Sequence, residues 1–572
     1  MHILGINGAF HDSSACLVRD GVVVAAAEEE RFLRLKHHKR ATPYNSHALP
    51  FHAIDYCLRA GGITLAEVDH VAYSFDPWLL TGGTTERHFA LPRDVEEARR
   101  GPGYEPWETI FLAGITAAPR MLRDDVPFHL RARFDGDAEA LGWRFHFVEH
   151  HVAHAASAFY PSPFERAAIM TLDGRGECVS TFLGRGRGTT MEKLNEVELP
   201  HSLGFLYERV TSHLGFLNSS DEYKVMALAS YGEPRYAGRF RSLLRWREDG
   251  GYEIAPFDLT ELVGPARPPK APIEARHFDI ASSLQVVLEE ACLALAGWLH
   301  RRTGEQNLVL AGGVALNCVM NARLARESEF ERVWVQPAAG DAGTSLGAAL
   351  EVWAEQQPGG TGAERWRMES AYLGPEYDDR EIAAALDHAK LRYRRCPDIA
   401  DATAECLARG KIVGWFQGRM EFGPRALGAR SIVASPTDPD MMQRMNELKD
   451  REDFRPVAPA VLAERAPEYF VGCTDSPFML FVYRVRPEVA EKVPAVRHVD
   501  GTARAQTVSA ASAPLFHRLI SRFEERSGVP VVVNTSFNTR SRPIVCTPQD
   551  ALECFYTSPI DVLAIGSYLL VK

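Results

Sequence analysis

The stretch AAIMTLDGRGECVSTFLGRGRG, residues 167–188, decides the fold of the first half of the chain. An apolar run ends in a small polar loop, LDGRGE, and the chain then returns as a second apolar run. This pattern predicts two paired β-strands joined by a tight loop. Residues 1–28 repeat it, with HILGING, a turn of Gly, His, Asp and Ser, and then ACLVRDGVVVAAAEEE. Two such units predict a duplicated α/β fold whose second copy starts near residue 165.

The remaining pattern gives the domain boundaries. Helical spacing over residues 280–302 precedes NLVLAGGVALN, which is typical of a buried strand followed by a glycine turn. Residues 356–365, QQPGGTGAER, have the composition of a linker, and strand and helix patterns restart after them. We therefore predict a first domain over residues 1–357, a linker over 358–369 and a second α/β domain over 370–572.

Composition narrows the class of protein. A chain of 572 residues is too long for one core. Its net charge of −11 disfavours a broad nucleic-acid surface. Its ten cysteines form no CxxC pair, which fits a reducing compartment. There is no run of about 18 apolar residues, and the first residues do not resemble a signal peptide. We expect a cytoplasmic protein that handles small molecules, with no nucleic-acid or membrane partner.

One segment of this acidic chain is strongly basic. Residues 418–455, GRMEFGPRALGARSIVASPTDPDMMQRMNELKDREDFR, interleave arginines and a lysine with glycines and prolines. Its cations are Arg419, Arg425, Arg430, Arg444, Lys449, Arg451 and Arg455. Glycines let a backbone approach a ligand, and guanidinium groups bind phosphate or carboxylate oxygens two at a time. The segment predicts a pocket for a small, densely anionic molecule; the alternative is a solvated basic loop.

A metal site is predicted from two histidines and two aspartates. His150 and His154 are four residues apart in VEHHVAHAASAF, a spacing that stacks two imidazoles on one face of a helix. Asp173 and Asp341 each follow an apolar strand. Two imidazoles with two carboxylates suit Fe(II), Mn(II) or Zn(II). The alternative is a pair of ordinary helix histidines.

Glycine-rich turns after strands predict phosphate binding, because they expose backbone N–H groups. Three occur, at residues 173–176, 312–317 and 340–345, which is the pattern of actin, hexokinase and Hsp70-like ATPase folds. Lys224 could reach a nucleotide phosphate; the alternative is a surface lysine. The strand end VVVNTSFN offers amide and hydroxyl groups that could hold an adenylate or a carbamoyl group.

These motifs together resemble a known family. GINGAFHDSSACL, AEEERFLRLKH, HHVAHAASAFY, LDGRGE, LAGGVALNCVMN, GDAGTSLGAA, FGPRALGARSI, FRPVAP and NTSFN occur in the order seen in the NodU/CmcH/TobZ-type O-carbamoyltransferases of antibiotic and nodulation-factor biosynthesis. The resemblance covers nearly the whole chain. It implies a duplicated ASKHA-like (actin/Hsp70-type) N-terminal domain and a YrdC-like α/β C-terminal domain.

The resemblance also implies a mechanism. The C-terminal domain would make carbamoyl-adenylate from carbamoyl phosphate and ATP, with magnesium accompanying the ATP. The N-terminal domain would then transfer the carbamoyl group to a hydroxyl of a small-molecule acceptor, with iron as the expected metal and manganese or zinc as alternatives. We expect these small molecules to be the partners, and we allow for a homodimer.

Residue roles follow by position. The implied carbamoyl phosphate and adenylate site is Arg425, Lys449, Arg455, Met479, Arg504, Asn534, Ser536 and Asn538, of which Lys449, Arg455 and Arg504 would be catalytic. The implied metal ligands are His150, His154, Asp173 and Asp341. The nucleotide loops of the transfer domain are Asp173, Gly174, Lys224, Gly312, Gly313, Asn317 and Asp341, and the acceptor side is Asp12, Lys36 and His37.

His11 is the predicted base of the transfer step. It follows the first strand, and a neutral imidazole can accept the proton of a poorly nucleophilic hydroxyl at neutral pH. Asp12, next in sequence, could orient the ring; the alternative is a turn histidine bonded to backbone. The acceptor itself is not specified by the sequence, and residues 78–120 and 202–222 are the expected places for its recognition.

The sequence is less compatible with three other functions. A threonylcarbamoyl-adenylate protein of tRNA modification would need a tRNA surface, which the acidic charge disfavours. A HypF-like protein that carbamoylates a thiol would carry CxxC zinc fingers, and none is present. A sugar kinase would leave residues 370–572 unexplained.

Overall fold

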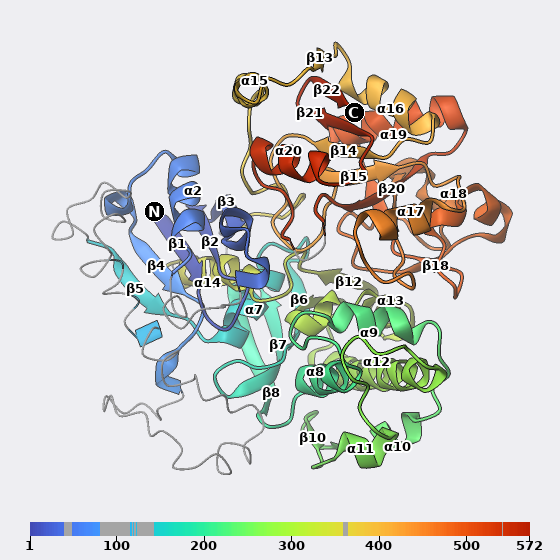
Figure 1. Cartoon of the computed structure of the whole chain (residues 1–572). Helices are drawn as coiled ribbons and strands as arrows, with labels where there is room; N and C mark the ends of the chain where they lie inside the picture. The colour runs from blue at the N-terminus through green and yellow to red at the C-terminus, as the bar shows by residue number, and fades with distance from the viewer. Residues whose placement is uncertain are drawn as a thin grey trace. The chain divides into compact units, whose positions relative to one another are not determined.

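The computed structural model describes residues 1–38, 49–79, 142–357, 364–539 and 542–572, with Ile115, Thr116, Ala118 and Leu122 (Figure 1). The chain divides into two compact units. Unit 1 contains Met1–Leu33 and His37–Met368, and unit 2 contains Arg34–Lys36 and Glu369–Lys572. The division after residue 368 lies at the end of the predicted linker, of which residues 358–363 lie outside the described part. Most of the acceptor segment proposed at residues 78–120 also lies outside it.

Unit 1 contains two five-stranded sheets of one topology. Their orders are β3-β2-β1-β4-β5 and β12-β11-β6-β7-β8, so the same succession occurs twice. In each sheet the first three strands along the chain are antiparallel neighbours and the last two join in parallel. The first sheet consists of β1 His2–Asn7, β2 Ser14–Arg19, β3 Val22–Glu28, β4 His70–Tyr73 and β5 Arg144–Phe147. The second consists of β6 Arg166–Leu172, β7 Val179–Arg187, β8 Thr190–Glu198, β11 Asn307–Ala311 and β12 Arg332–Val335. The mixed α/β class is confirmed, and the repeat that the sequence predicted is present.

Two helices between these sheets position the candidate site. α7 (His150–Phe159) packs on β6 and β11 of the second sheet, α14 (Ala342–Glu355) packs on β1, β2 and β4 of the first, and the two helices pack on each other. Glycines make these approaches possible. A Cβ on Gly347 would lie 1.8 Å from the carbonyl oxygen of Ala153 in α7, and one on Gly5 would lie 1.9 Å from that of Ser345. A larger residue at either position would push α14 away from its neighbours.

The other helices of unit 1 include its longest. They are α1 Glu30–Leu33, α2 Phe51–Gly61, α8 Leu203–His213, α9 Glu222–Ala229, α10 Ala237–Arg241, α11 Leu259–Val263, α12 Ala275–Thr303 and α13 Cys318–Glu327, with the short ribbon of β9 Leu244–Trp246 and β10 Tyr252–Ile254. Among the described residues α12 is long and apolar enough to cross a membrane, although charged residues interrupt its apolar sequence. However, 72% of the apolar 18-residue stretch of α12 is buried inside the protein, as in a core helix.

Unit 2 is built on an eight-stranded mixed sheet of order β13-β22-β21-β14-β15-β20-β16-β19. Its strands are β13 Arg394–Arg395, β14 Val413–Phe416, β15 Arg430–Ala434, β16 Ala458–Leu462, β19 Gln506–Val508, β20 Val531–Ser536, β21 Val562–Ile565 and β22 Tyr568–Val571. A small ribbon pairs β17 Tyr483–Arg484 with β18 Thr502–Ala503. The helices are α15 Asp379–His388, α16 Ile399–Ala408, α17 Met441–Leu448, α18 Ala466–Tyr469, α19 Pro514–Ser527 and α20 Pro548–Tyr556. Every residue of β14, β15, β16 and β21 is buried, so the centre of the sheet is the core of this unit.

Candidate functional site

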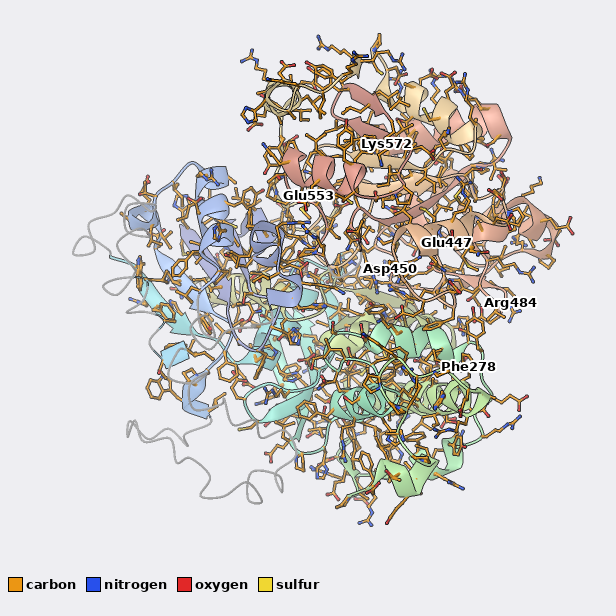
Figure 2. The ribbon with its side chains drawn as sticks, in the orientation of Figure 1. Phe278, Glu447, Asp450, Arg484, Glu553 and Lys572 are labelled. Carbon is orange, nitrogen blue, oxygen red and sulfur yellow. The ribbon has the colours of Figure 1, made fainter. Side chains whose placement is uncertain are left out.

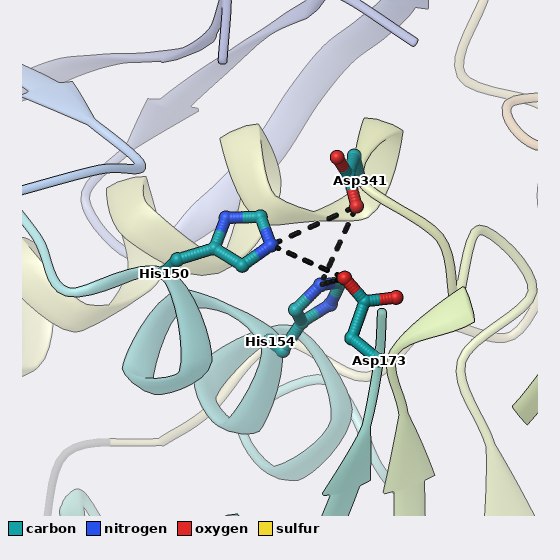
Figure 3. A group of neighbouring side chains, drawn as sticks. All are labelled: His150, His154, Asp173 and Asp341. Atoms are coloured by element: carbon teal, nitrogen blue, oxygen red, sulfur yellow. Dashed lines mark ion pairs between the residues drawn. The ribbon is translucent and has the colours of Figure 1, made fainter. Parts of the chain in front are cut away.

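Four side chains of unit 1 converge as a metal site would require (Figure 3). One ligand atom from each of His150, His154, Asp173 and Asp341 lies within 4.8 Å of all the others. The Nε2 atoms of the two histidines lie 3.6 to 3.9 Å from the Oδ2 of Asp173 and the Oδ1 of Asp341. His150, His154 and Asp341 are buried. The structure therefore brings together all four residues that the sequence proposed as ligands.

The local fold explains this convergence. His150 and His154 lie one turn apart in α7, Asp173 follows β6, and Asp341 precedes α14. The carboxylate of Glu177, four residues after Asp173, accepts hydrogen bonds from the backbone N–H groups of His150 (3.0 Å) and Asp76 (2.6 Å). It thereby caps the N-terminus of α7 from the loop that carries a ligand.

Electrostatics match the geometry. Burial alone would lower the pKa of His150, but Asp173 and Asp341 raise it to about 9. Burial would raise the pKa of Asp173, but His150 and His154 hold it below its ordinary value. Burial raises the pKa of Glu177 to about 7.

The polar atoms of this group fit a divalent metal. Within the part of the chain that the structure describes, the Nε2 atoms of both histidines and both carboxylate oxygens of Asp341 are buried and make no hydrogen bond. Buried polar atoms without partners are costly, so such a set indicates ligands for an ion. Nδ1 of His150 lies 3.3 Å from the carbonyl oxygen of Ser74, the kind of contact that orients a metal-binding imidazole.

His11 lies beside this group. It follows β1, and its Nδ1 is 2.9 Å from Oδ2 of Asp12 and 3.9 Å from Oδ2 of Asp341. The other carboxylate oxygen of Asp12 is 2.9 Å from Nδ1 of His37. The structure thus joins His11, Asp12 and His37, whereas Lys36 is grouped with unit 2.

The predicted nucleotide loops of unit 1 surround Asp173. The backbone N–H of Gly313 donates to its Oδ1 (2.7 Å), and a Cβ on Gly312, whose φ is +90°, would lie 2.1 Å from the carbonyl oxygen of Leu172. A Cβ on Gly174 would lie 3.0 Å from Oε1 of Glu208. Close approach of the backbone therefore requires glycine at position 312, whereas a Cβ on Gly174 would meet the end of a side chain.

Two other predicted nucleotide contacts are engaged elsewhere. Oδ1 of Asn317 accepts from the N–H of Met320 (3.0 Å), and its Nδ2 donates to Gln285 (2.8 Å), so its amide caps α13. Lys224, in α9, forms an ion pair with Asp221 at 3.1 Å. A nucleotide contact by either side chain remains a prediction.

In unit 2, Lys449 is the centre of a second group. It directly follows α17, between Glu447 and Asp450, which are labelled in Figure 2. Its Nζ donates to the side chains of Ser536 (2.9 Å) and Asn538 (2.6 Å), and to the carbonyl oxygen of Ser536. Burial, followed by Arg451 and Arg455, lowers the pKa of this buried lysine well below its usual value.

The other predicted residues of unit 2 lie on neighbouring loops and strands. Asn534, on β20, donates to Gln506 (2.8 Å) and to the carbonyl oxygen of Ala426 (3.2 Å), beside Arg425. Arg504 lies between β18 and β19, and Met479 is buried with a φ of +56°.

Several cations of residues 418–455 have structural roles that the sequence did not reveal. The buried guanidinium of Arg430 stacks on Phe416 at 3.7 Å and donates to backbone carbonyls, including that of Gln417. Arg419 donates to the carbonyl oxygen of Leu373, Arg451 donates to Asn446, and Arg444 pairs with Asp438. These four arginines contact groups of the protein itself, and an anion contact by any of them remains a prediction.

Sequence reasoning also missed four residues that shape the two groups. They are Glu177, Glu208, Glu421 and Gln506. Burial and Glu222 raise the pKa of Glu208 to about 7. Oε1 of Glu421 accepts from the N–H groups of Leu427 (2.7 Å) and Ala429 (2.8 Å), which holds the glycine-rich turn of unit 2. Only Glu177 carried a signal, since it lies in the same LDGRGE loop as Asp173.

Comparison with known proteins gives the family. A family model described as carbamoyltransferase N-terminus matches residues 2–350, and one described as carbamoyltransferase C-terminus matches residues 404–572. The chain is 38% identical to nodulation protein NolNO of Sinorhizobium fredii, over 99% of this chain and 80% of that protein. It is 40% identical to nodulation protein U of Rhizobium fredii, over 93% of this chain and 89% of that protein.

Solved structures are more distant. Full-length HypF in the phosphate- and nucleotide-bound form aligns with a TM-score of 0.37 and 14% identity, over 63% of this chain and 56% of that one. The two family models together span most of the sequence and both structural units. The chain therefore belongs to the carbamoyltransferase family, and it is a transferase enzyme.

Proposed function

We propose that the chain is an ATP-dependent O-carbamoyltransferase that works in two steps, one in each unit. The proposal is carried by one observation: a chain of this family holds a buried group of metal-type ligands in unit 1 and a buried lysine surrounded by arginines in unit 2. The first group suits a cation and the second suits phosphates. Carbamoyl transfer through an adenylate needs both.

The first step is assigned to unit 2, for which we keep the proposal of a YrdC-like domain. Carbamoyl phosphate reacts with water to give carbamate and phosphate. A carbamate oxygen then attacks the α-phosphorus of ATP, the bond to the β-phosphate breaks, and carbamoyl-adenylate and pyrophosphate form. Lys449, Arg455, Arg425 and Arg504 would neutralise the negative charge gathered in this step. Asn534, Ser536 and Asn538 would orient the adenylate.

The second step is assigned to unit 1. A hydroxyl oxygen of the acceptor attacks the carbamoyl carbon, the bond from that carbon to the phosphate oxygen breaks, and AMP leaves. Nε2 of His11 takes the hydroxyl proton, with Nδ1 held by Asp12. Gly174, Gly312 and Gly313 would receive the phosphate through backbone N–H groups.

His150, His154, Asp173 and Asp341 would hold the metal, for which we propose Fe(II). When bound, such an ion supplies Lewis acidity that polarises a carbonyl or phosphoryl oxygen. The four ligands would keep this charge within reach of His11, whose Nδ1 lies 3.9 Å from Asp341. We propose a hydroxylated small molecule as acceptor.

The test is to incubate the protein with carbamoyl phosphate, ATP, magnesium and a panel of hydroxylated sugars and natural products. We expect pyrophosphate release that depends on carbamoyl phosphate, and an acceptor whose mass rises by one HNCO unit. Pyrophosphate release without carbamoyl phosphate, or HNCO added to a polypeptide thiol in place of a hydroxyl, would overturn the proposal.

A further inference from the structure

The loop that carries His11 is fastened from two sides. The buried side chain of Asn7, at the end of β1, donates to the carbonyl oxygens of His11 and Asp12 (both 3.1 Å). The backbone N–H of Asp12 donates to the carbonyl oxygen of His37 (3.0 Å). Asp12 has a φ of +52° and His37 a φ of +60°, a region that costs free energy unless surrounding contacts maintain it. The contact between Asp12 and His37 therefore requires a strained backbone conformation at both residues.

The carboxylate of Asp12 is shared by two imidazoles. Oδ2 is 2.9 Å from Nδ1 of His11, and Oδ1 is 2.9 Å from Nδ1 of His37. Burial would raise the pKa of Asp12, but His37 and His11 hold it well below its usual value. An ionised carboxylate only accepts hydrogen bonds, so both Nδ1 atoms carry protons. Nε2 of His11 is then the nitrogen with a lone pair.

His37 is itself held by a buried charged network. Its backbone N–H donates to Oε2 of Glu30 (2.5 Å). Oε1 of Glu30 pairs with Arg31 (2.6 Å), and Arg31 also pairs with Glu28. Glu28, Glu30 and Arg31 are all buried. This network leaves His37 little freedom to move away from Asp12.

One ring nitrogen of His37 is engaged with Asp12. Nδ1 is bonded to Asp12, and Nε2 is a buried atom that makes no hydrogen bond within the described residues. Within the described residues, the ring nitrogen of His37 that makes a hydrogen bond is the one facing the carboxylate that orients His11.

We infer that His37 is a positioning residue for the transfer step: held by Glu30, it fixes the Asp12 carboxylate and through it the Nδ1–H form and the orientation of His11. The inference rests on the proposed function, in which His11 is the base. It gives a specific role to His37, which the sequence places on the acceptor side. Misplacing a base by about 1 Å can cost about a hundredfold in rate.

Two substitutions and one control test the inference. His37→Gly removes the ring and suits the positive φ, so it introduces no backbone strain. His37→Asn also tolerates this backbone conformation, and its side-chain N–H occupies nearly the place of Nδ1. The control is His52→Asn, because Nδ1 of His52 pairs with Glu29 at 2.6 Å in the same unit, outside the site.

Acceptor carbamoylation is measured beside pyrophosphate release, as kcat and acceptor KM. For His37→Gly we expect kcat to fall roughly 10- to 100-fold at unchanged KM. For His37→Asn most of the rate should return, and His52→Asn should match the wild type. A rise in KM at constant kcat would assign His37 to acceptor binding, and a parallel loss of pyrophosphate release would make it structural; either overturns the inference.

A second readout does not need activity. ¹⁵N NMR of histidine-labelled protein reports which ring nitrogen of His11 carries the proton. The Nδ1–H form should dominate in the wild type and in His37→Asn, and give way to a mixture in His37→Gly. An unchanged His11 spectrum in His37→Gly would overturn the inference. Lack of acceptor carbamoylation by the wild type would defeat the proposed function, while the NMR result would still decide the role of His37.

Discussion

The metal-type group of unit 1 and the lysine group of unit 2 handle buried charge in opposite ways. In unit 1, His150, His154 and Asp341 leave buried ligand atoms without hydrogen bonds in the described part of the chain. In unit 2, the ammonium of Lys449 donates to oxygens of Ser536 and Asn538, all of which are neutral. The first group leaves buried ligand atoms without hydrogen bonds, and the second lacks a compensating negative charge among its described partners.

The difference indicates what each group binds. Buried imidazole nitrogens and carboxylate oxygens that make no hydrogen bonds are stabilised by a cation, because one metal ion can coordinate several of them at once. A buried cation with neutral partners is stabilised by an anion, which adds charge-assisted hydrogen bonds. The two groups are therefore expected to fail independently when either is disabled.

The largest expected effect comes from removing a metal ligand. His150→Ala should lose bound metal and lower acceptor carbamoylation by about a thousandfold or more, because a bound ion contributes several kcal/mol of charge stabilisation. Elemental analysis of the purified protein measures the metal, and carbamoyl-phosphate-dependent pyrophosphate release measures unit 2. That release should continue.

The matched control is His300→Ala, which removes an imidazole paired with Glu329 at 2.9 Å on the same unit. It should retain metal and transfer. If His150→Ala kept a full complement of metal, or if strong chelators left wild-type transfer intact, the contrast between the two groups would break down.

A smaller effect is expected in unit 2. Lys449→Ala should lower pyrophosphate release about a hundredfold, since a charge-assisted contact to a reacting phosphate contributes about 3 kcal/mol. Metal content should not change. Lys411→Ala is the control, because this lysine is half exposed and pairs with Asp561 at 3.2 Å. Release near the wild-type rate in Lys449→Ala would place adenylate formation away from this group.

The sequence predicted the metal-type group better than the lysine group, and the physical reason lies in spacing. His150 and His154 share a helix face at a fixed interval, Asp173 directly follows β6, and Asp341 lies between β12 and α14, so the two carboxylates come from connections that follow strands. Such regular geometry can be inferred without coordinates. The duplication was visible for the same reason, as a repeated strand–loop–strand pattern.

The role of each cation in residues 418–455 could not be inferred in this way. Arg430 and Lys449 look alike in the sequence, yet the first stacks on Phe416 and bonds to carbonyls, while the second meets residues 87 and 89 positions away. Contacts of such long sequence separation depend on the assembled sheet. The sharing of Asp12 by His11 and His37 was equally invisible, because it depends on two unusual backbone conformations.

The last prediction concerns the carboxyl group of Glu351, which belongs neither to the metal-type group nor to the lysine group. Glu351, in α14, accepts a hydrogen bond from the hydroxyl of Tyr160 (2.9 Å), and burial raises its pKa to about 7. This pKa exceeds the value of 4.5 for the free group, so the folded state binds more protons than the unfolded state between these two values. The contribution of Glu351 to stability is therefore complete below about pH 4.5, is lost as the pH rises towards 7, and is constant above it.

Glu351→Gln keeps an oxygen for Tyr160 and cannot ionise. Relative to the wild type, its free energy of unfolding should gain about 1 to 2 kcal/mol between pH 5 and 8, allowing for partial solvent access. Urea denaturation of both proteins at several pH values measures this difference. The contributions of the other titrating groups are the same in both proteins and cancel. Metal content and both partial reactions should stay at wild-type levels, since a buried charge outside the two groups should affect stability alone. The prediction would be contradicted if the difference in free energy of unfolding did not change with pH, or if it grew towards low pH. Either result would show that Glu351 is ionised in the folded protein despite its burial in unit 1.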